Sequence, residues 1–326
     1  MINRSSFKDL KRRISLYLLP SHKYFQQEGL VWGTSYNIIY EAREDLGEKI
    51  LETLKMIDTS LSVFNPNSLI SRINRNETLQ VDSHFQYLFE TAKLISGLSN
   101  GVYDPTTKPL TDLWTQQAYN DTVPSTLQLQ NAKLLIGINE CSIIDGEIQK
   151  KSEKTQFDFS SLAKGYGVDC IASMFKKNDV RNYMIEIGGE CMAKGINPYK
   201  HIWKVRLDIP KNFETVEISD TYYDVFNVAV ATAGNYRSLY TSSQGSIGHI
   251  INPVSCKPVK TNLISATVFA ENCVTADALS TACFIMGLKS LSLFIDKFPS
   301  VRIVFVQKES NNGNFRIIDS LNGYDK

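Results

Sequence analysis

The chain has 326 residues, of which 43% are hydrophobic, and its 35 basic and 34 acidic residues leave a net charge of +1. This composition supports a large buried core, in one domain or two, and excludes an intrinsically disordered chain. Because the charges nearly balance and no basic stripe carries interleaved aromatic residues, we expect no nucleic-acid partner. The 6 cysteines form no C-x-x-C pair, so neither a zinc site nor a disulfide framework is expected.

The amino-terminal segment matches an export signal only in part. Lys11-Arg12-Arg13 precedes the apolar stretch 14–19, but that stretch is short and no small-residue cleavage site follows it. We interpret residues 1–28 as a tail or a trimmed export segment, and we assign residues 29–320 to a single domain because no repeat or low-complexity linker divides them. No stretch approaches the ~20 apolar residues that a membrane-spanning helix requires.

Helices and strands alternate irregularly in the first half of the chain. Apolar residues at helical spacing predict helices after a strand at the start, and Asp82 and Ser125 are the expected caps of two of them. In chain order the predicted elements are a strand at 30–40, a helix at 46–61, a helix from Asp82 to Asn100-Gly101, a helix from Ser125 to Gly137, a strand at 141–148 and a helix at 161–177.

The second half of the chain is richer in strands. The predicted strands lie at 183–187, 202–209, 225–232, 246–251, 263–270 and 301–307, and helices are predicted only near 276–286 and 288–298. This order lacks the regular alternation of a doubly wound fold. It predicts an α+β protein with mostly antiparallel sheet and packed helices.

Asp277 and Thr281 lie four residues apart in an otherwise apolar helix. Residues at this spacing share one helix face, and a carboxylate and a hydroxyl are both hard oxygen ligands of the kind that Mg²⁺ accepts. Asp and Thr are indifferent helix formers, so their presence here calls for a reason. The alternative is that Asp277 caps the helix amino terminus while Thr281 bonds back to a carbonyl.

Several short polar or glycine-bearing signals interrupt the apolar runs, and each also has a purely structural interpretation. Gly188-Gly189 forms a tight turn or lets a backbone approach a ligand closely. Lys164 is a solvated lysine or a point charge for a phosphate, and His249 at a strand end is structural or catalytic. Neither a P-loop nor a complete G-x-G-x-x-G turn occurs, so any nucleotide is held in another way.

Taken in order, these signals resemble the motifs of one family, the FAD:protein FMN transferases of the ApbE type. The matching segments are Trp32-Gly33-Thr34, 62–74, 101–106, 158–169, 186–190, 231–237, 248–253 and 276–281. The resemblance implies an ApbE-like, T-fold-related α+β domain with an FAD cleft. It also implies an enzyme that cleaves the pyrophosphate of FAD, transfers FMN to a Ser or Thr hydroxyl of an acceptor flavoprotein as a phosphoester and releases AMP.

The resemblance also implies roles for individual residues. Mg²⁺ would be held by Asp277, Thr281 and a backbone carbonyl near Ser161, and His249 would activate the acceptor hydroxyl. Residues implied to line the FAD cleft are Thr34, Asn74, Asp104, Thr106, Lys164, Gly165, Asp169, Gly188, Gly189, Glu190, Thr232 and Gly234. Members of the family commonly work on the periplasmic side of the inner membrane, so the resemblance implies a location at the cell envelope and allows peripheral association with the membrane. Because the export signal matches only in part, a cytoplasmic location stays open as the alternative.

This chain departs from the family pattern around the proposed base. Asn252 replaces an aspartate, Ala233 replaces a serine, Ser160 replaces a glycine, and 253–257 lack the usual P-x-T-G. None of these changes removes a predicted metal ligand, so they bear on transfer more than on FAD binding. Two alternatives stay open: a hydrolase that splits FAD into FMN and AMP, and a non-catalytic FAD-binding protein.

Overall fold

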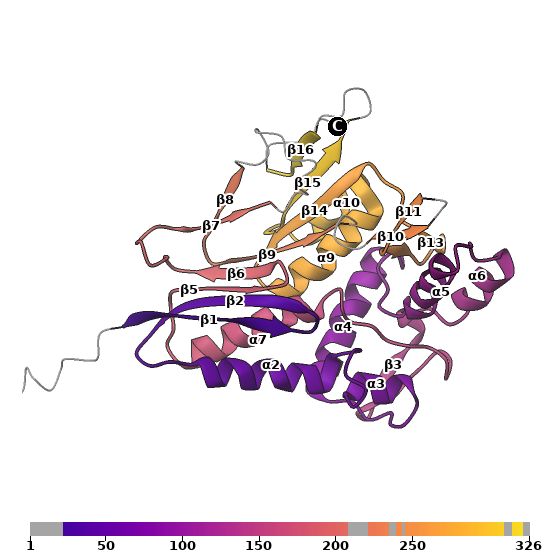
Figure 1. Cartoon of the computed structure of the whole chain (residues 1–326), viewed down its shortest axis with the longest axis horizontal. Coiled ribbons are helices and arrows are strands. Elements are labelled where there is room, and N and C mark those ends of the chain that lie inside the picture. The colour runs from indigo at the N-terminus through magenta and orange to yellow at the C-terminus, as the bar shows by residue number, and fades with distance from the viewer. Residues whose placement is uncertain (1–21, 208–220, 235–238, 243–244, 310–314, 322–326) are drawn as a thin grey trace, which may run out of the picture.

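The computed structural model describes residues 22–207, 221–234, 239–242, 245–309 and 315–321 (Figure 1). An 8-stranded antiparallel sheet forms its centre, in the strand order β1-β2-β5-β6-β9-β14-β15-β16. The strands are β1 (Lys23–Val31), β2 (Thr34–Ala42), β5 (Tyr183–Ile187), β6 (Glu190–Lys194), β9 (Val228–Ala233), β14 (Leu263–Ala270), β15 (Arg302–Lys308) and β16 (Phe315–Asp319).

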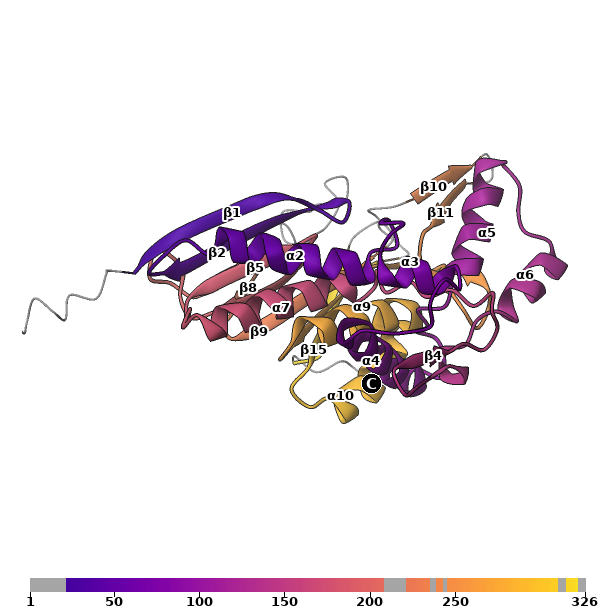
Figure 2. The same ribbon diagram turned by 90° about the horizontal axis from the view of Figure 1, so that it is seen from below.

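Helices cover one face of this sheet, as the view from below shows (Figure 2). They are α2 (Gly47–Leu61), α4 (Ser83–Leu98), α7 (Ala163–Lys177), α9 (Cys273–Met286) and α10 (Ser290–Lys297). Alternate residues of the strands point toward these helices, so Ile38 and Ile185 pack on Phe175 of α7 in one continuous buried cluster. α9 packs against β9 and β14 of the sheet and also against α7.

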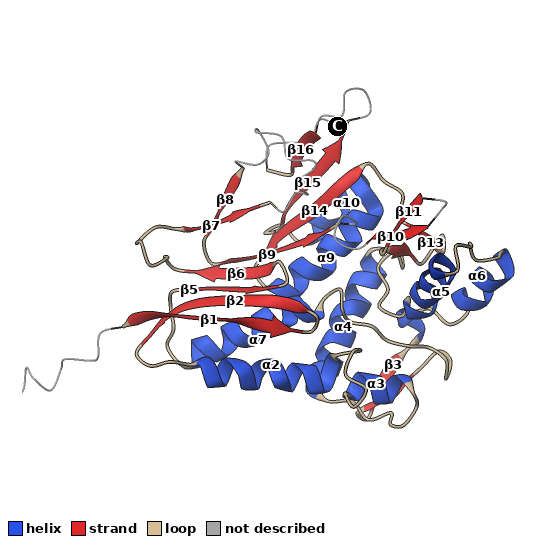
Figure 3. Cartoon of the chain, in the orientation of Figure 1, coloured by secondary structure: helices blue, strands red, loops and turns tan. Residues whose placement is uncertain are grey.

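A smaller lobe of short helices and hairpins lies beside α4 and α9 (Figure 3). Its elements are α3 (Leu69–Asn74), α5 (Lys108–Tyr119), α6 (Thr126–Lys133), η1 (Ile138–Glu140), β3 (Ser142–Ile144), β4 (Glu147–Gln149), β10 (Leu239–Ser242), β11 (Gly245–Gly248), β12 (Ile251–Asn252) and β13 (Lys257–Pro258). The opposite face of the main sheet carries the hairpin of β7 (Trp203–Arg206) and β8 (Tyr222–Val225), where Tyr223 packs on Phe269.

The predicted α+β fold with antiparallel sheet is confirmed, and so are the caps at Asp82 and Ser125. The bounds of three predicted strands were wrong because a two-residue turn interrupts each of them. Trp32-Gly33 turns 30–40 into the β1–β2 hairpin, Asp145-Gly146 turns 141–148 into β3–β4, and Phe226-Asn227 separates β8 from β9. All of these turn residues except Phe226 have a positive φ, which reverses the chain within a run of strand-forming residues.

Other elements were not predicted at all. These are α3, α5, β6, η1, β10, β13 and β16, which are short or carry weak periodicity. Part of the strand predicted at 202–209 falls outside the described residues. The sheet includes Lys23, six residues before the boundary proposed at 29. We expected no stretch long and apolar enough to cross a membrane, but the 25-residue helical run Cys273–Lys297 has that length and composition. Its first part is α9, most of whose side chains are buried in the protein core.

Candidate active site

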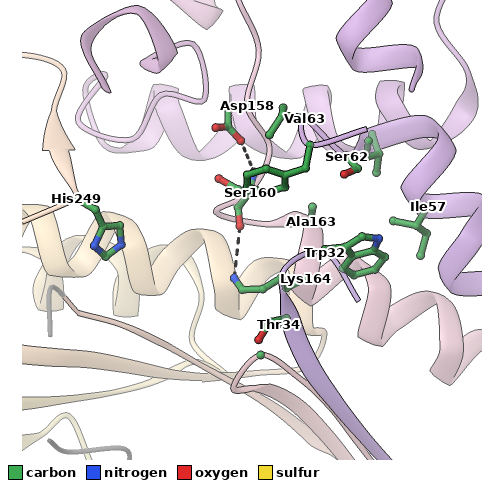
Figure 4. A pocket seen from close by; sticks show the side chains of 13 residues that line it. Trp32, Thr34, Ile57, Ser62, Val63, Asp158, Ser160, Ala163, Lys164 and His249 are labelled. Carbon is green, nitrogen blue, oxygen red and sulfur yellow. Dashed lines mark hydrogen bonds between the residues drawn. The ribbon is translucent and has the colours of Figure 1, made fainter. Parts of the chain in front are cut away.

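A pocket of about 350 Å³ opens where the β1–β2 turn, the β5–β6 turn, the end of α2 and the start of α7 converge. Its walls come from segments far apart in the sequence, and Figure 4 shows His249 on one side, Trp32 on the other and Lys164 between them. The lining residues are Trp32, Thr34, Ile57, Leu61, Ser62, Val63, Phe64, Asp158, Ser160, Ala163, Lys164, Gly188 and His249. The pocket therefore gathers several of the predicted site residues.

Lys164 connects this pocket to two buried carboxylates. Its Nζ lies 3.3 Å from Glu190 Oε2 and 3.7 Å from Asp277 Oδ2, and it donates to the Ser160 carbonyl at 3.4 Å. The Lys164 side chain is 28% exposed, whereas those of Glu190 and Asp277 are 5% and 4% exposed. Glu190 Oε2 has no well-aligned hydrogen-bond donor, even though the ammonium is near it. A partly exposed ammonium therefore lies next to two almost completely buried carboxyl groups.

Burial changes the protonation of this cluster. It raises the pKa of Glu190 to about 8 and also raises the pKa of Asp277, although Lys164 opposes both shifts. Burial works against the charge on Lys164, but the two carboxylates outweigh it and raise the pKa of the ammonium. A carboxyl with a pKa of about 8 holds its proton at neutral pH, so the cluster is close to charge balance without a metal ion. A divalent cation bound here would take the place of that proton.

Asp277 does not cap the amino terminus of its own helix, which rules out that alternative. The N-cap of α9 is Asn272, whose side chain accepts a hydrogen bond from Thr275 N at 2.9 Å. Asp277 Oδ2 instead accepts a hydrogen bond from Gly165 N of α7 at 3.0 Å. In the described part of the chain, Thr281 has no hydrogen bond back to a carbonyl, so its hydroxyl is available as a ligand.

The donor set suits Mg²⁺ better than zinc. Among the described residues no group of three His, Cys, Asp or Glu side chains could hold a metal. Asp277 and Thr281 offer a carboxylate and a hydroxyl, and the Ser161 side chain already bonds Tyr103 OH at 2.9 Å, which leaves its carbonyl for a ligand role. Hard oxygen donors of mixed type, with water completing the shell, are what Mg²⁺ accepts.

The β5–β6 turn forms the floor of the pocket through two glycines. Gly188 and Gly189 have φ values of 63° and 104°, which favour glycine. A Cβ on Gly188 would lie 2.9 Å from Thr34 Cγ2 and 3.1 Å from Lys164 Cδ, so any side chain would displace the two pocket residues. Gly189 N donates to Glu186 Oε1 at 2.6 Å. The glycine pair is thus required for the pocket's shape, as the sequence suggested.

Trp32 is a pocket residue that the sequence analysis did not select. It occupies the first position of the β1–β2 turn with φ at 50°, a conformation that costs a bulky residue roughly 1 kcal/mol or more. Its ring lines the pocket and contacts Gly167, where a Cβ would lie 2.7 Å from the indole. The buried Nε1 of Trp32 has no hydrogen-bond partner within the part of the chain that the structure describes. The sequence signal that would have identified Trp32 is an aromatic residue directly before a glycine within a predicted strand.

Three of the predicted FAD-lining residues form hydrogen bonds between segments of the smaller lobe. The Asn74 amide exchanges two hydrogen bonds with the backbone of Phe157, at 2.7 and 2.8 Å. Asp104 accepts from Thr106 N and Oγ1 at 2.8 and 2.6 Å and from Ile138 N at 3.0 Å, while Thr106 Oγ1 accepts from Gly137 N at 2.8 Å. None of the three is among the residues that line the pocket.

Three more predicted residues are not among those that line the pocket. Thr232 Oγ1 pairs with Thr267 Oγ1 across β9 and β14 at 2.9 Å, and Gly234 follows the end of β9. Asp169 accepts hydrogen bonds from Cys273 N and Val274 N, both at 2.8 Å. Asn235 and Tyr236 of the same predicted motif lie outside the described residues.

Comparison with known proteins shows the family of this chain. The ApbE family model matches residues 32–305. The chain belongs to the ApbE family. A FAD:protein FMN transferase of Vibrio cholerae is 30% identical over 275 residues, covering 79% of this chain and 80% of that protein, and one of Haemophilus influenzae is 27% identical over 282 residues, covering 81% of each.

Solved structures of the family share this fold. The Flavin Transferase ApbE from Vibrio cholerae matches with a TM-score of 0.80 and 26% identity, covering 91% of this chain and 97% of that one. The apo form of the Pseudomonas stutzeri flavinyl transferase ApbE matches with a TM-score of 0.79 and 25% identity, covering 91% and 95%. The predicted ApbE-like architecture is confirmed.

Proposed function

We propose that this protein is an FAD:protein FMN transferase that moves FMN from FAD to a Ser or Thr hydroxyl of an acceptor flavoprotein and releases AMP. The observation that carries the proposal is the Lys164–Glu190–Asp277 cluster, whose Lys164 lines the pocket. It combines a partly exposed ammonium, which suits a phosphate, with two buried carboxyl groups that would bind a divalent cation on losing their protons. Membership of the ApbE family supports the same conclusion.

The pocket residues would divide the work between binding and proton transfer. Lys164 meets a pyrophosphate oxygen as a point charge, and the Gly188 turn lets the dinucleotide approach the backbone closely. Trp32 offers an aromatic face and an unpaired N–H to a flat ring. His249 lines the same pocket and would take the proton of an incoming hydroxyl, as imidazole commonly does in catalysis.

The residues that would hold Mg²⁺ are Asp277, Thr281 and the Ser161 carbonyl. The ion would neutralise charge on the pyrophosphate, because phosphoryl transfer depends on positioning and charge neutralisation more than on covalent chemistry by the enzyme. Asp277 would be oriented for this by its hydrogen bond from Gly165 N. The phosphoester linkage and the need for Mg²⁺ are parts of this proposal.

We also propose that the enzyme works at the periplasmic face of the inner membrane, attached peripherally, since related transferases act on envelope flavoproteins. Fractionation of cells that produce the tagged full chain tests this. Recovery in a periplasmic or membrane-surface fraction is expected, and recovery with cytoplasmic markers only contradicts it.

Incubation of the protein with FAD, MgCl₂ and a purified acceptor flavoprotein domain tests the function. We expect flavin fluorescence to comigrate with the denatured acceptor and AMP to appear in equal amount. AMP without labelled acceptor would identify an FAD hydrolase. Bound FAD with neither product would identify a binding protein, and replacing the target Ser or Thr of the acceptor by Ala is the control for site-specific transfer.

A further inference from the structure

The amino termini of α7 and α9 are joined by reciprocal hydrogen bonds. Leu162, at the N-cap position of α7, provides no side-chain cap, and Asp277 of α9 accepts the hydrogen bond of Gly165 N instead, at 3.0 Å. In the other direction, Asp169 of α7 accepts from the first two amides of α9, at 2.8 Å each. Each helix therefore supplies a carboxylate to the other helix's amino terminus. We call this set of bonds the α7–α9 interlock.

The two helices touch through their backbones at the same place. A Cβ on Gly165 would lie 2.4 Å from the Cys273 carbonyl oxygen and 2.9 Å from Asp277 Cβ, so only glycine permits this approach. Because Gly165 follows Lys164 directly, the contact also fixes where the lysine leaves its helix. The distance between the two helix ends thus determines how Lys164 and Asp277 face each other.

Asp169 is not needed to start α9. That helix already has its own side-chain cap, since Asn272 accepts from Thr275 N at 2.9 Å. Burial raises the pKa of Asp169 to about 6, so keeping a carboxylate here is unfavourable for the fold by itself. An ordinary cap would not require a second helix to contribute an acidic residue at that cost, which suggests another reason for its presence.

We propose that Asp169 is a positioning residue of the transfer reaction, which acts by holding the first turn of α9 so that Asp277 stays oriented toward Gly165 and Lys164. The inference rests on the proposed function and deepens it. Asp169 touches neither the pocket nor the reacting groups. It acts through the Cys273 and Val274 amides, which lie about one helical turn before Asp277.

A matched pair of variants tests this role. Asp169→Asn removes the charge and one of the two acceptor oxygens of Asp169, while Asn272→Ala removes the cap that belongs to α9 alone. Each deletes a hydrogen bond at the same helix end, which lowers the thermal midpoint, and in Asp169→Asn the relief from burying a charge offsets part of that loss. With FAD and acceptor saturating, we expect the Mg²⁺ concentration for half-maximal rate to rise about tenfold in Asp169→Asn, equivalent to ~1.4 kcal/mol, and less than about twofold in Asn272→Ala.

Two measurements besides turnover separate positioning from plain destabilisation. Calorimetric titration of FAD-loaded protein with MgCl₂ should show the same weakening in Asp169→Asn only. Amide hydrogen exchange should show faster exchange at Gly165 in Asp169→Asn than in Asn272→Ala, because only the former loosens the partner of that amide. Equal Mg²⁺ requirement and equal Gly165 exchange in the two variants would overturn the proposal.

The wild-type chain provides a test that survives failure of the variants to fold. If the interlock is one unit, the amides of Gly165, Cys273 and Val274 should exchange through a common opening with one free energy. Independent openings would overturn the inference. Absence of Mg²⁺-dependent transfer by the wild type would instead refute the proposed function, and the exchange experiment distinguishes that outcome because it requires no turnover.

Discussion

Two regions carry family motifs, yet their polar groups are in opposite states. In the smaller lobe, the side chains of Asn74, Asp104 and Thr106 form hydrogen bonds with backbone groups of neighbouring segments. In and next to the pocket, Trp32 Nε1 and Glu190 Oε2 are buried without a hydrogen-bond partner among the described residues, although Glu190 Oε2 lies 3.3 Å from Lys164 Nζ. Buried polar atoms are normally satisfied, so two such atoms close together are typical of a ligand-binding site, whereas the third, Ser265 Oγ, lies on β14.

The motifs of this chain therefore contain two kinds of residue, one structural and one facing the pocket. Some members hold loops in place so that the pocket keeps its shape, and others face the ligand. The two kinds respond differently to substitution: the first should change the free energy of unfolding and the second the rate or the affinity. The following predictions test that division, from the largest expected effect to the smallest.

Asp277→Asn should reduce Mg²⁺-dependent transfer on the order of 10³-fold, because it removes the anionic ligand whose ion supplies several kcal/mol of charge stabilisation. The amide oxygen can still accept from Gly165 N, so the thermal midpoint should change little. Initial rates over a range of MgCl₂ concentration provide the measurement. Ser280→Ala, which deletes a buried hydroxyl bonded to the Asp277 carbonyl at 2.8 Å, is the control and should keep the rate. Retained activity in Asp277→Asn would remove it from the metal site.

His249→Ala should slow transfer by about 10²-fold while FAD binding stays unchanged, because only proton removal from the acceptor is impaired. Single-turnover rates and FAD titration measure the two quantities. His84→Ala is a suitable control, since His84 bonds Tyr166 OH at 2.7 Å and is not among the pocket residues. An equal loss of rate in both variants would argue against a specific role for His249.

Asp169 should make the free energy of unfolding fall as the pH rises, whereas an ordinary salt-bridged carboxylate makes it rise. Its folded pKa of about 6 exceeds the usual 3.8 because of burial, so the unfolded chain releases this proton first as the pH rises. The free energy of unfolding should therefore fall between pH 4 and 6, by roughly 2–3 kcal/mol. Urea unfolding at several pH values measures it, and Asp169→Asn should lack this component. A rise over the same window would mean that the α9 amides outweigh burial.

Asn74→Ala should lower the free energy of unfolding by about 1–3 kcal/mol, because it leaves the Phe157 N–H and carbonyl unpaired in a half-buried place. The rate per folded molecule should stay within a factor of about two, as expected for a residue that ties a loop. Urea unfolding and turnover at 25 °C test both parts. A loss of FAD affinity without loss of stability would move Asn74 to the ligand-facing kind.

Asn252→Asp should have the smallest effect, a rise in transfer rate of about fivefold at most, as a partly exposed charge beside a base contributes at most ~1 kcal/mol. The fold should tolerate it, because Asn252 Oδ1 acts only as an acceptor, from Val254 N at 2.9 Å and Ser255 N at 3.2 Å. Rates measured at low and high salt test the charge effect. No change at either would show that this loop works equally well with asparagine.

Much of the site followed from the sequence because short-range chemistry determines it. Asp277 and Thr281 share a helix face by spacing alone, and Gly188-Gly189 required positive φ values that only a turn provides. The roles of Asn74, Asp104 and Asp169 did not follow, because their partners, Phe157, Ile138 and Cys273, lie tens of residues away. Trp32 was missed for the same reason, because its ring contacts Gly167 and lines the pocket only in the folded chain.

Local sequence by itself determined the caps at Asp82 and Ser125, the strands β5 and β14, the antiparallel α+β class and the oxygen pair on α9. Those features depend on propensity, periodicity and turn chemistry within a few residues. Only the tertiary structure decided that Lys164 lies between Glu190 and Asp277, and that α7 and α9 cap each other. The physical reason is that burial and long-range hydrogen bonding assign a polar side chain its partner, and neither is encoded in its immediate neighbours.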